Sequence, residues 1–181
     1  NSFSKTNLHF EIKDGKIGDF NGNGKSDILG FYSNGNPYLI EFYKDISSHG
    51  YPYNYNYFPS LIVKGKYDKA LLGDFNGDGK TDMFIPVAEE SKDWNMYIAT
   101  GNGFIELAYP NFSYYKPNNS YVDSGRSYYY NRQYLAQDLN QDGKSDFIEF
   151  FSHSRQNRNT ENNFSEFIVN AYENKGFDSF T

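Results

Sequence analysis

The stretch GDFNGDGKTD, residues 73–82, decides how this chain is interpreted. It places three carboxylates, one carboxamide and three glycines within ten residues. Two related stretches occur on either side of it, GDFNGNGKSD from Gly18 and QDLNQDGKSD from Gln137. Their first aspartates are residues 19, 74 and 138, at intervals of 55 and 64 residues. Repetition at this spacing predicts one supersecondary unit used three times, with connections of different length.

The ending Gly-Lys-Thr is also the ending of a phosphate-binding loop, but the rest of the pattern does not fit. Such a loop reads GxxxxGK[ST], with a glycine five residues before its second glycine. Here that position holds Asp19, Asp74 or Asp138, whose carboxylate would repel a phosphate. No helical pattern follows that would hold an anion at its N-terminus. Spacing, charge and context therefore argue against a nucleotide site.

Oxygen atoms at alternate positions favour a metal site instead. Each loop has oxygen-bearing side chains at positions 1, 3 and 5, a glycine at position 6 and a carboxylate at position 9. Calcium takes six to eight oxygen ligands, and the backbone carbonyl of position 7 would supply one, with its lysine ammonium turned to solvent. Magnesium fits less well, because it keeps several waters and needs a strict octahedron. The candidate ligands for up to three structural Ca²⁺ ions are Asp19, Asn21, Asn23, Lys25 and Asp27, then Asp74, Asn76, Asp78, Lys80 and Asp82, then Asp138, Asn140, Asp142, Lys144 and Asp146.

Charge agrees with this interpretation, and the alternative is a set of three polar turns without an ion. The formal net charge is −6, which three divalent cations would neutralise. Asn23 stands where the other two loops have Asp78 and Asp142, so the first site is predicted to bind most weakly, since affinity follows the number of charged ligands. Glu149 is twelfth from Asp138, as in a helix-flanked calcium loop, but strand-like sequence follows, so we interpret it as a strand residue.

The segments around each loop predict strands. Short apolar runs bounded by Gly, Asn and Asp precede or follow each loop, and aromatic residues make up 20% of the chain. WNMYIATGNGF, from Trp94, predicts a hairpin with a glycine turn. We expect an all-β fold, a partial β-propeller of about three four-stranded antiparallel blades with calcium loops between strands. The expected single unit is residues 1–181, with repeats at about 12–66, 67–130 and 131–181, and residues 110–132 and 152–163 as insertions between strands.

The loop pattern D-x-[DN]-x-[DN]-G-x-x-D between two strands resembles the FG-GAP or VCBS repeat of integrin-α-type β-propellers. More narrowly, GDFNGDGKTDMFIPV followed by WNMYIATGNGF is similar to repeats of bacterial Rhs and insecticidal toxin-complex B-component (SpvB-like) proteins. The third loop departs from the pattern at Gln137, Leu139 and Gln141. The resemblance implies a non-catalytic, calcium-stabilised structural or scaffolding segment of a large bacterial protein that is secreted or exposed on the cell surface.

Composition limits the partners and the chemistry. A net charge of −6 argues against nucleic acid, the absence of cysteine against disulfides, and no apolar run is long enough to span a bilayer. Three blades cannot close a ring, so we expect the remainder of a longer chain, or partner subunits, to complete the propeller. The histidines are residues 9, 49 and 153, far apart in the sequence, and no nucleophile motif is present, so we do not expect an enzyme.

Two tyrosine-rich stretches leave a second function open. YPYNYNYF would place Tyr51, Tyr53, Tyr55 and Tyr57 on one face if it is extended, and SYYYNRQY spans Ser127 to Tyr134. Such rows either pack inside the protein or form a contact surface for a protein or glycan ligand. The alternative function is therefore a cell-surface adhesion or carbohydrate-binding module.

Overall fold

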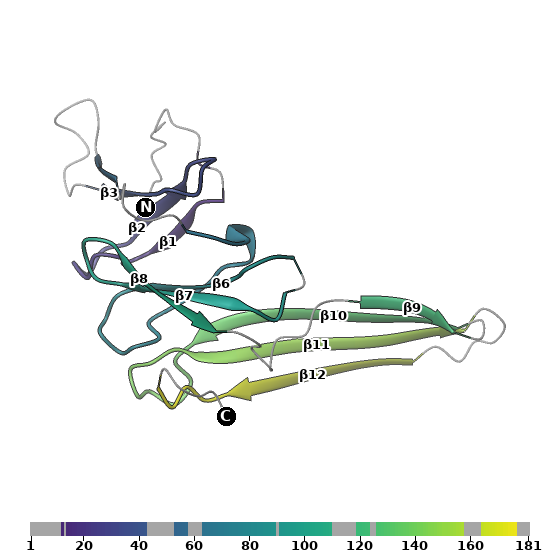
Figure 1. Ribbon diagram of the computed structural model, residues 1–181. Helices are drawn as coiled ribbons and strands as arrows, with labels where there is room; N and C mark the ends of the chain where they lie inside the picture. Colours follow the sequence, from purple (N-terminus) through teal and green to yellow (C-terminus); the bar gives the residue numbers. More distant parts are fainter. Residues whose placement is uncertain are drawn as a thin grey trace, which may run out of the picture.

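The computed structural model describes residue 12 and residues 14–42, 53–57, 63–89, 91–109, 119–123, 126–157 and 164–176, without the side chains of residues 42, 53–57, 109 and 157. Twelve strands form three four-stranded antiparallel sheets, shown in Figure 1. The one helical element in the described residues is a single 3-10 turn, η1 (Tyr67–Lys69). The expected all-β class and the three antiparallel sheets are confirmed.

Strand order is simple in each sheet. The first sheet contains, in order, β1 (Lys16–Gly18), β2 (Asp27–Phe31), β3 (Pro37–Phe42) and β4 (Tyr53–Tyr57). The second contains β5 (Leu71–Gly73), β6 (Asp82–Pro86), β7 (Trp94–Ala99) and β8 (Phe104–Tyr109). The third contains β9 (Asn119–Asp123), β10 (Arg126–Gln137), β11 (Asp146–Asn157) and β12 (Phe164–Tyr172).

The sheets stack face to face in the order of the chain (Figure 1). Side chains of a strand alternate between its two faces, so one strand can contribute to two cores. In β6, Met83 and Ile85 pack against Leu29 of the first sheet, whereas Phe84 belongs to the core that contains Phe147 of the third. The second sheet is therefore covered on both faces.

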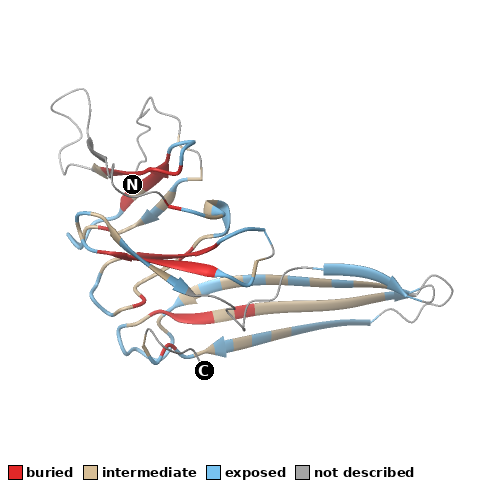
Figure 2. Cartoon of the chain, viewed as in Figure 1, coloured by how far each residue is buried: buried red, intermediate tan, exposed pale blue. Residues whose placement is uncertain are grey.

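Burial follows from this stacking. Every residue of β6 and β7 is buried, and Figure 2 shows buried residues concentrated in the first two sheets and at the start of β11. A strand covered on both faces is apolar at consecutive positions rather than at alternate ones. Pro86 is the last residue of β6, at the strand end where a residue without an N–H was expected.

The third sheet differs from the prediction. Strands β10 and β11 are twelve residues each, and they continue beyond the second sheet, as Figure 1 shows. The expectation that residues 110–132 and 152–163 are insertions is wrong for 119–123, 126–132 and 152–157, which are strand. This sheet therefore begins at Asn119 and not near residue 131. Alternating aromatic residues, whose rings stack across the strands, form a sheet here without an apolar core.

The position of the fourth strand also changes. In the first and second sheets, the strand before the loop, the strand after it and two further strands follow in order, as predicted. In the third sheet the extra strand, β9, comes before the loop and pairs with the distal half of β10. The third unit is thus a variant of the other two.

Candidate metal centre

The three acidic loops occupy the same place in each sheet. Loop 1 (residues 19–27) joins β1 to β2, loop 2 (residues 74–82) joins β5 to β6, and loop 3 (residues 138–146) joins β10 to β11. In each, the position-9 aspartate is the first residue of the following strand. All fifteen candidate ligands lie within described parts of the chain.

The loops share one pattern of hydrogen bonds, which loop 2 illustrates. Asp74 Oδ1 accepts the N–H of Gly77 at 2.7 Å, and Asp74 Oδ2 accepts that of Gly79 at 2.7 Å. Asn76 Oδ1 accepts the N–H of Asp78 at 3.0 Å, and Asp78 Oδ1 accepts that of Lys80 at 2.9 Å. Loops 1 and 3 repeat these four bonds. In each loop the side-chain oxygens at positions 1, 3 and 5 therefore accept backbone N–H groups of the same loop.

The position-9 aspartates are buried and accept hydrogen bonds from backbone N–H groups. Asp82 is 0% exposed; its Oδ2 accepts the N–H of Phe75 at 3.0 Å and its Oδ1 that of Ala99, in β7, at 2.8 Å. Asp146 repeats this with Leu139 and Asn174, both at 2.9 Å. These bonds hold the loop against the end of the third strand.

Burial changes the acidity of two of these carboxyls. It raises the pKa of Asp82 to about 7, against the opposing effect of the amide hydrogen bonds. Burial likewise raises the pKa of Asp27 to about 6, with smaller contributions from the charges of Glu41 and Asp19. A nearby cation would favour the charged form and would relieve this cost.

Successive loops are bonded to one another. The Thr81 N–H donates to the carbonyl of Asp19 at 2.7 Å, and the Ser145 N–H donates to that of Asp74 at 2.6 Å. In addition, the Asp19 N–H donates to Thr81 Oγ1 at 3.0 Å. The residue at position 8 of one loop is thus hydrogen-bonded to the residue at position 1 of the preceding loop. The three loops lie in a row along one edge of the stacked sheets, here called the file of loops.

The glycine immediately before each of the first two loops makes room for this contact. A Cβ added at Gly18 would lie 2.6 Å from Thr81 Cγ2, and one added at Gly73 would lie 2.5 Å from Ser145 Oγ. No heavier residue fits at either position without displacing its neighbour. In the third unit Gln137 occupies the corresponding place.

The lysine at position 7 of loop 2 contacts a neighbouring carboxylate. The exposed ammonium of Lys80 donates to Asp78 Oδ2 at 2.9 Å. Burial would raise the pKa of Asp78, but the hydrogen bonds from Lys80 and Asn76 outweigh it and lower the pKa. An ammonium thus neutralises part of the loop charge, and an ion would compete with it.

Two glutamates that sequence reasoning missed lie beside the loops. Asn21 Nδ2 donates to Glu41 Oε1, at the end of β3, and Asn140 Nδ2 donates to Glu173 Oε1 at 3.3 Å. The corresponding residue of the second unit is Ile98, two positions after Met96 in β7. The contacts with glutamate hold the side-chain amides of Asn21 and Asn140 with their oxygen atoms toward the loop. Only the pairing of strands reveals these contacts, because the partners are 20 and 33 residues apart.

Glu149 is a strand residue, as interpreted from the sequence. It lies in β11, is 4% exposed, and forms an ion pair with Arg132 at 3.1 Å. Its carboxylate accepts hydrogen bonds from Asn170 Nδ2 at 2.8 Å and from the hydroxyls of Tyr134 and Tyr172 at 3.2 Å each. It therefore serves the third sheet and not loop 3.

The second tyrosine-rich stretch forms a ladder of rings on the third sheet. Tyr121 stacks on Tyr128 with centroids 4.6 Å apart, and Tyr130 stacks on His153 at 4.6 Å with an interplanar angle of 5°. Rings stacked in this way cover one another's faces. A sugar ring would need such a face to be open in order to bind. His153 belongs to this ladder. Tyr51, His9 and His49, and the side chains of residues 53–57, lie outside the described part of the chain.

Fold and loops together define an all-β protein of three stacked antiparallel sheets, each with an acidic loop between two of its strands. Within the described ranges, no cluster of three or more His, Cys, Asp or Glu side chains is found. No helix in the same ranges is long and apolar enough to cross a membrane. Comparison with known proteins finds no matching family model, curated protein or solved structure.

Proposed function

We propose that the chain is a non-catalytic structural module whose three loops each hold one Ca²⁺ ion. The observation that carries the proposal is the threefold repetition of one arrangement of oxygen-bearing side chains, at positions 1, 3 and 5 of each loop. The ligands would be these three side chains, the position-7 carbonyl and the position-9 carboxylate, which keeps lone pairs beyond those used by its two amide bonds. Because Asn oxygens and a carbonyl complete the set, few carboxylates are needed.

We further propose that the stacked sheets are successive blades of a partial β-propeller, within a large secreted or surface-exposed bacterial protein of the Rhs or toxin-complex type. Support comes from the face-to-face stacking in chain order and from the resemblance of the repeats. The remainder of a longer chain, or partner subunits, would supply the other blades. Loops with few charged ligands bind calcium weakly, which suits an extracellular setting where calcium is abundant.

Adhesion or carbohydrate binding is the less favoured function. Tyr128 and Tyr130 stack on Tyr121 and His153, so these two rings offer less open surface to a ligand than the 43% exposed Tyr129 does.

Thermal unfolding with calcium and with chelator tests the proposal. An ion bound only by the folded state at about one hundred times its dissociation constant stabilises it by about 2.7 kcal/mol. We therefore expect a higher Tm in calcium, a smaller gain in magnesium, and up to three ions by titration calorimetry. Equal melting in calcium and chelator would refute calcium binding and leave three self-sufficient polar turns.

A further inference from the structure

The face of the third sheet that points away from the second sheet, here called the outer face, has no covering layer in the described residues. Tyr134, Ala136 and Phe147 pack toward the second sheet, so their neighbours along the strands point the other way. The outer face is defined by Gln133, Leu135, Phe150, Ser152, Phe167 and Val169.

Apolar side chains of this face are exposed at positions that are buried in the second sheet. Leu135 lies three residues before the first residue of its loop and is 53% exposed. Leu71 occupies the same position in the second sheet and is a core residue. Leu139 is 48% exposed, whereas Phe75, also at position 2 of its loop, is 1% exposed. Phe167 and Val169 are 66% and 53% exposed. Contiguous exposure of this kind marks an interaction surface.

A further sheet of the same kind does not fit on this face in the same way. The junctions between sheets need a glycine at the place of Gly73, because the next loop's side chain lies 2.5 Å from its would-be Cβ. The third unit has Gln137 there. It also has Gln141, with φ of 63°, where the first two loops have the glycines against which the next lysine packs. Both substitutions obstruct another loop of the file.

Charge is absent from the outer face. Apart from the loop residue Asp146, the outward positions of β10, β11 and β12 carry only apolar residues, Ser, Asn, Gln and Tyr, although 22% of the chain is charged. The other charged residues of these strands, such as Arg132, Glu149 and Glu166, lie on the opposite face. Depletion of charge is the compositional signal of an interface core. An uncharged face offers no opposite charge to a charged partner, whereas a second copy of the same uncharged face is electrostatically compatible with it. The Ser, Asn and Gln side chains of the face can both donate and accept hydrogen bonds.

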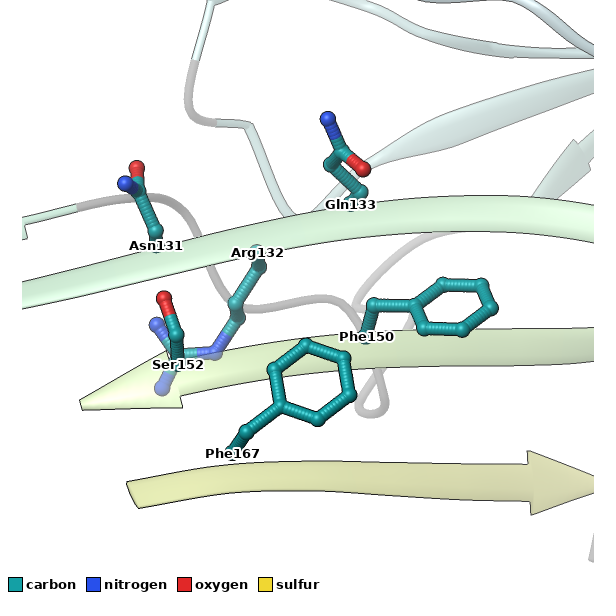
Figure 3. A pocket seen from close by; sticks show the side chains of 6 residues that line it. All are labelled: Asn131, Arg132, Gln133, Phe150, Ser152 and Phe167. Carbon is teal, nitrogen blue, oxygen red and sulfur yellow. The ribbon is translucent and has the colours of Figure 1, made fainter. Parts of the chain in front are cut away.

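A hollow in the middle of the face offers room for a side chain. It has a volume of about 310 Å³ and is lined by Asn131, Arg132, Gln133, Phe150, Ser152 and Phe167. Arg132 is ion-paired with Glu149. Figure 3 shows Phe150 and Phe167 side by side on neighbouring strands, with Gln133 on the third. We propose that the outer face of the third sheet is a homodimer interface, on which a second copy of the chain packs its own outer face about a two-fold axis.

Oligomeric state in solution tests this directly, because a two-fold interface closes at two copies. Sedimentation velocity over a range of protein concentrations should show a monomer–dimer equilibrium. Val169→Lys places two ammonium groups in the interface and should weaken dimerisation at least on the order of a hundredfold. The matched control is Ile105→Lys, on β8 of the second sheet, where the isoleucine is 55% exposed. It should dimerise as the unmodified chain does.

Monomer at every concentration, an open series of larger assemblies, or equal dimerisation of the two lysine variants would overturn the proposal. Circular dichroism of both variants shows whether they are folded. A second measurement uses the absence of cysteine in the chain. The thiol of Gln133→Cys should react with a maleimide more slowly as protein concentration rises. The thiol of Thr100→Cys, in the β7–β8 turn, should react at a constant rate, and equal behaviour of the two would also contradict the interface.

Discussion

At the scale of single residues, the glycine before each of the first two loops is set by a neighbour in the next sheet. Gly73 needs no unusual backbone conformation, but its missing Cβ makes room for Ser145. This steric requirement couples a residue of one unit to the sequence of the next, 72 positions later. The same requirement is relaxed in the third unit, where a glutamine stands.

Gly73→Ala should therefore destabilise the protein by about 1–3 kcal/mol, the usual cost of overpacking. Its Cβ would meet Ser145 Oγ at 2.5 Å and Ala136 Cβ at 3.2 Å. Gly103→Ala is the control, because nothing lies within 4 Å of a Cβ there. Urea unfolding measures both, and an equal effect of the two substitutions would remove the steric explanation.

Charge at position 5 should set calcium affinity. Asn23 Oδ1 and Asp78 Oδ1 each accept the N–H of the lysine two residues later at 2.9 Å, so the two side chains occupy the same place. Asn23→Asp should tighten the first site, and Asp78→Asn should weaken the second, each by roughly one order of magnitude. Titration calorimetry measures both. Unchanged affinities in both variants would show that these side chains are not ligands.

At the scale of elements, the position-9 aspartate of the second sheet joins three strand ends. Asp82 begins β6, accepts the amide of Phe75 after β5, and accepts that of Ala99 at the end of β7. A single buried carboxylate thereby fixes the loop and the register of the strands beside it.

Asp82→Asn should destabilise the protein by about 1–3 kcal/mol even in chelator. The carboxamide has one acceptor oxygen, so one of the two buried N–H groups would face its NH₂ group without a partner. Chelator separates this loss from any loss of calcium binding. Asp78→Asn is the matched control, since that side chain is exposed: the substitution removes an exposed ion pair with Lys80 but leaves no buried N–H group without a partner. If Asp82→Asn were as stable as Asp78→Asn in chelator, the two amide hydrogen bonds of Asp82 would not contribute to stability.

Sequence predicted those elements whose signals are local. Alternating oxygens located the loops, and Gly101 and Gly103 located the turn between β7 and β8, where the Thr100 N–H donates to the carbonyl of Gly103 at 2.9 Å. The distal third sheet was missed because Ser, Asn and Tyr were taken as loop composition, although every second residue of β10 faces the same way. The contact of Glu41 with Asn21 depends on the pairing of β2 with β3, which no local pattern encodes.

At the scale of the whole molecule, the second sheet contributes side chains to two hydrophobic cores, one on each of its faces. Trp94, the single tryptophan, is 2% exposed in the core between the second and third sheets. Phe147 of the third sheet is fully buried in the same core. Separation of these sheets therefore changes the environment of a built-in fluorophore.

Because the sheets share cores and bonded loops, we expect one cooperative transition. Trp94 fluorescence and far-UV circular dichroism should melt at the same temperature. Phe147→Ala should lower both together, at a cost of about 3–5 kcal/mol. Loss of the fluorescence signal well before the dichroism signal would instead show that the third sheet unfolds independently.

The file of loops also determines where the array can grow by gene duplication. The second unit offers Gly73 to the unit after it and Thr81 to the unit before it, so a tandem copy of this unit would meet compatible surfaces at both new junctions. A tandem copy of the third unit would place the side chains of Gln137 and Gln141 against an incoming loop. Lengthening in the course of evolution, or by design, is therefore open in the middle of the array and obstructed after its third unit.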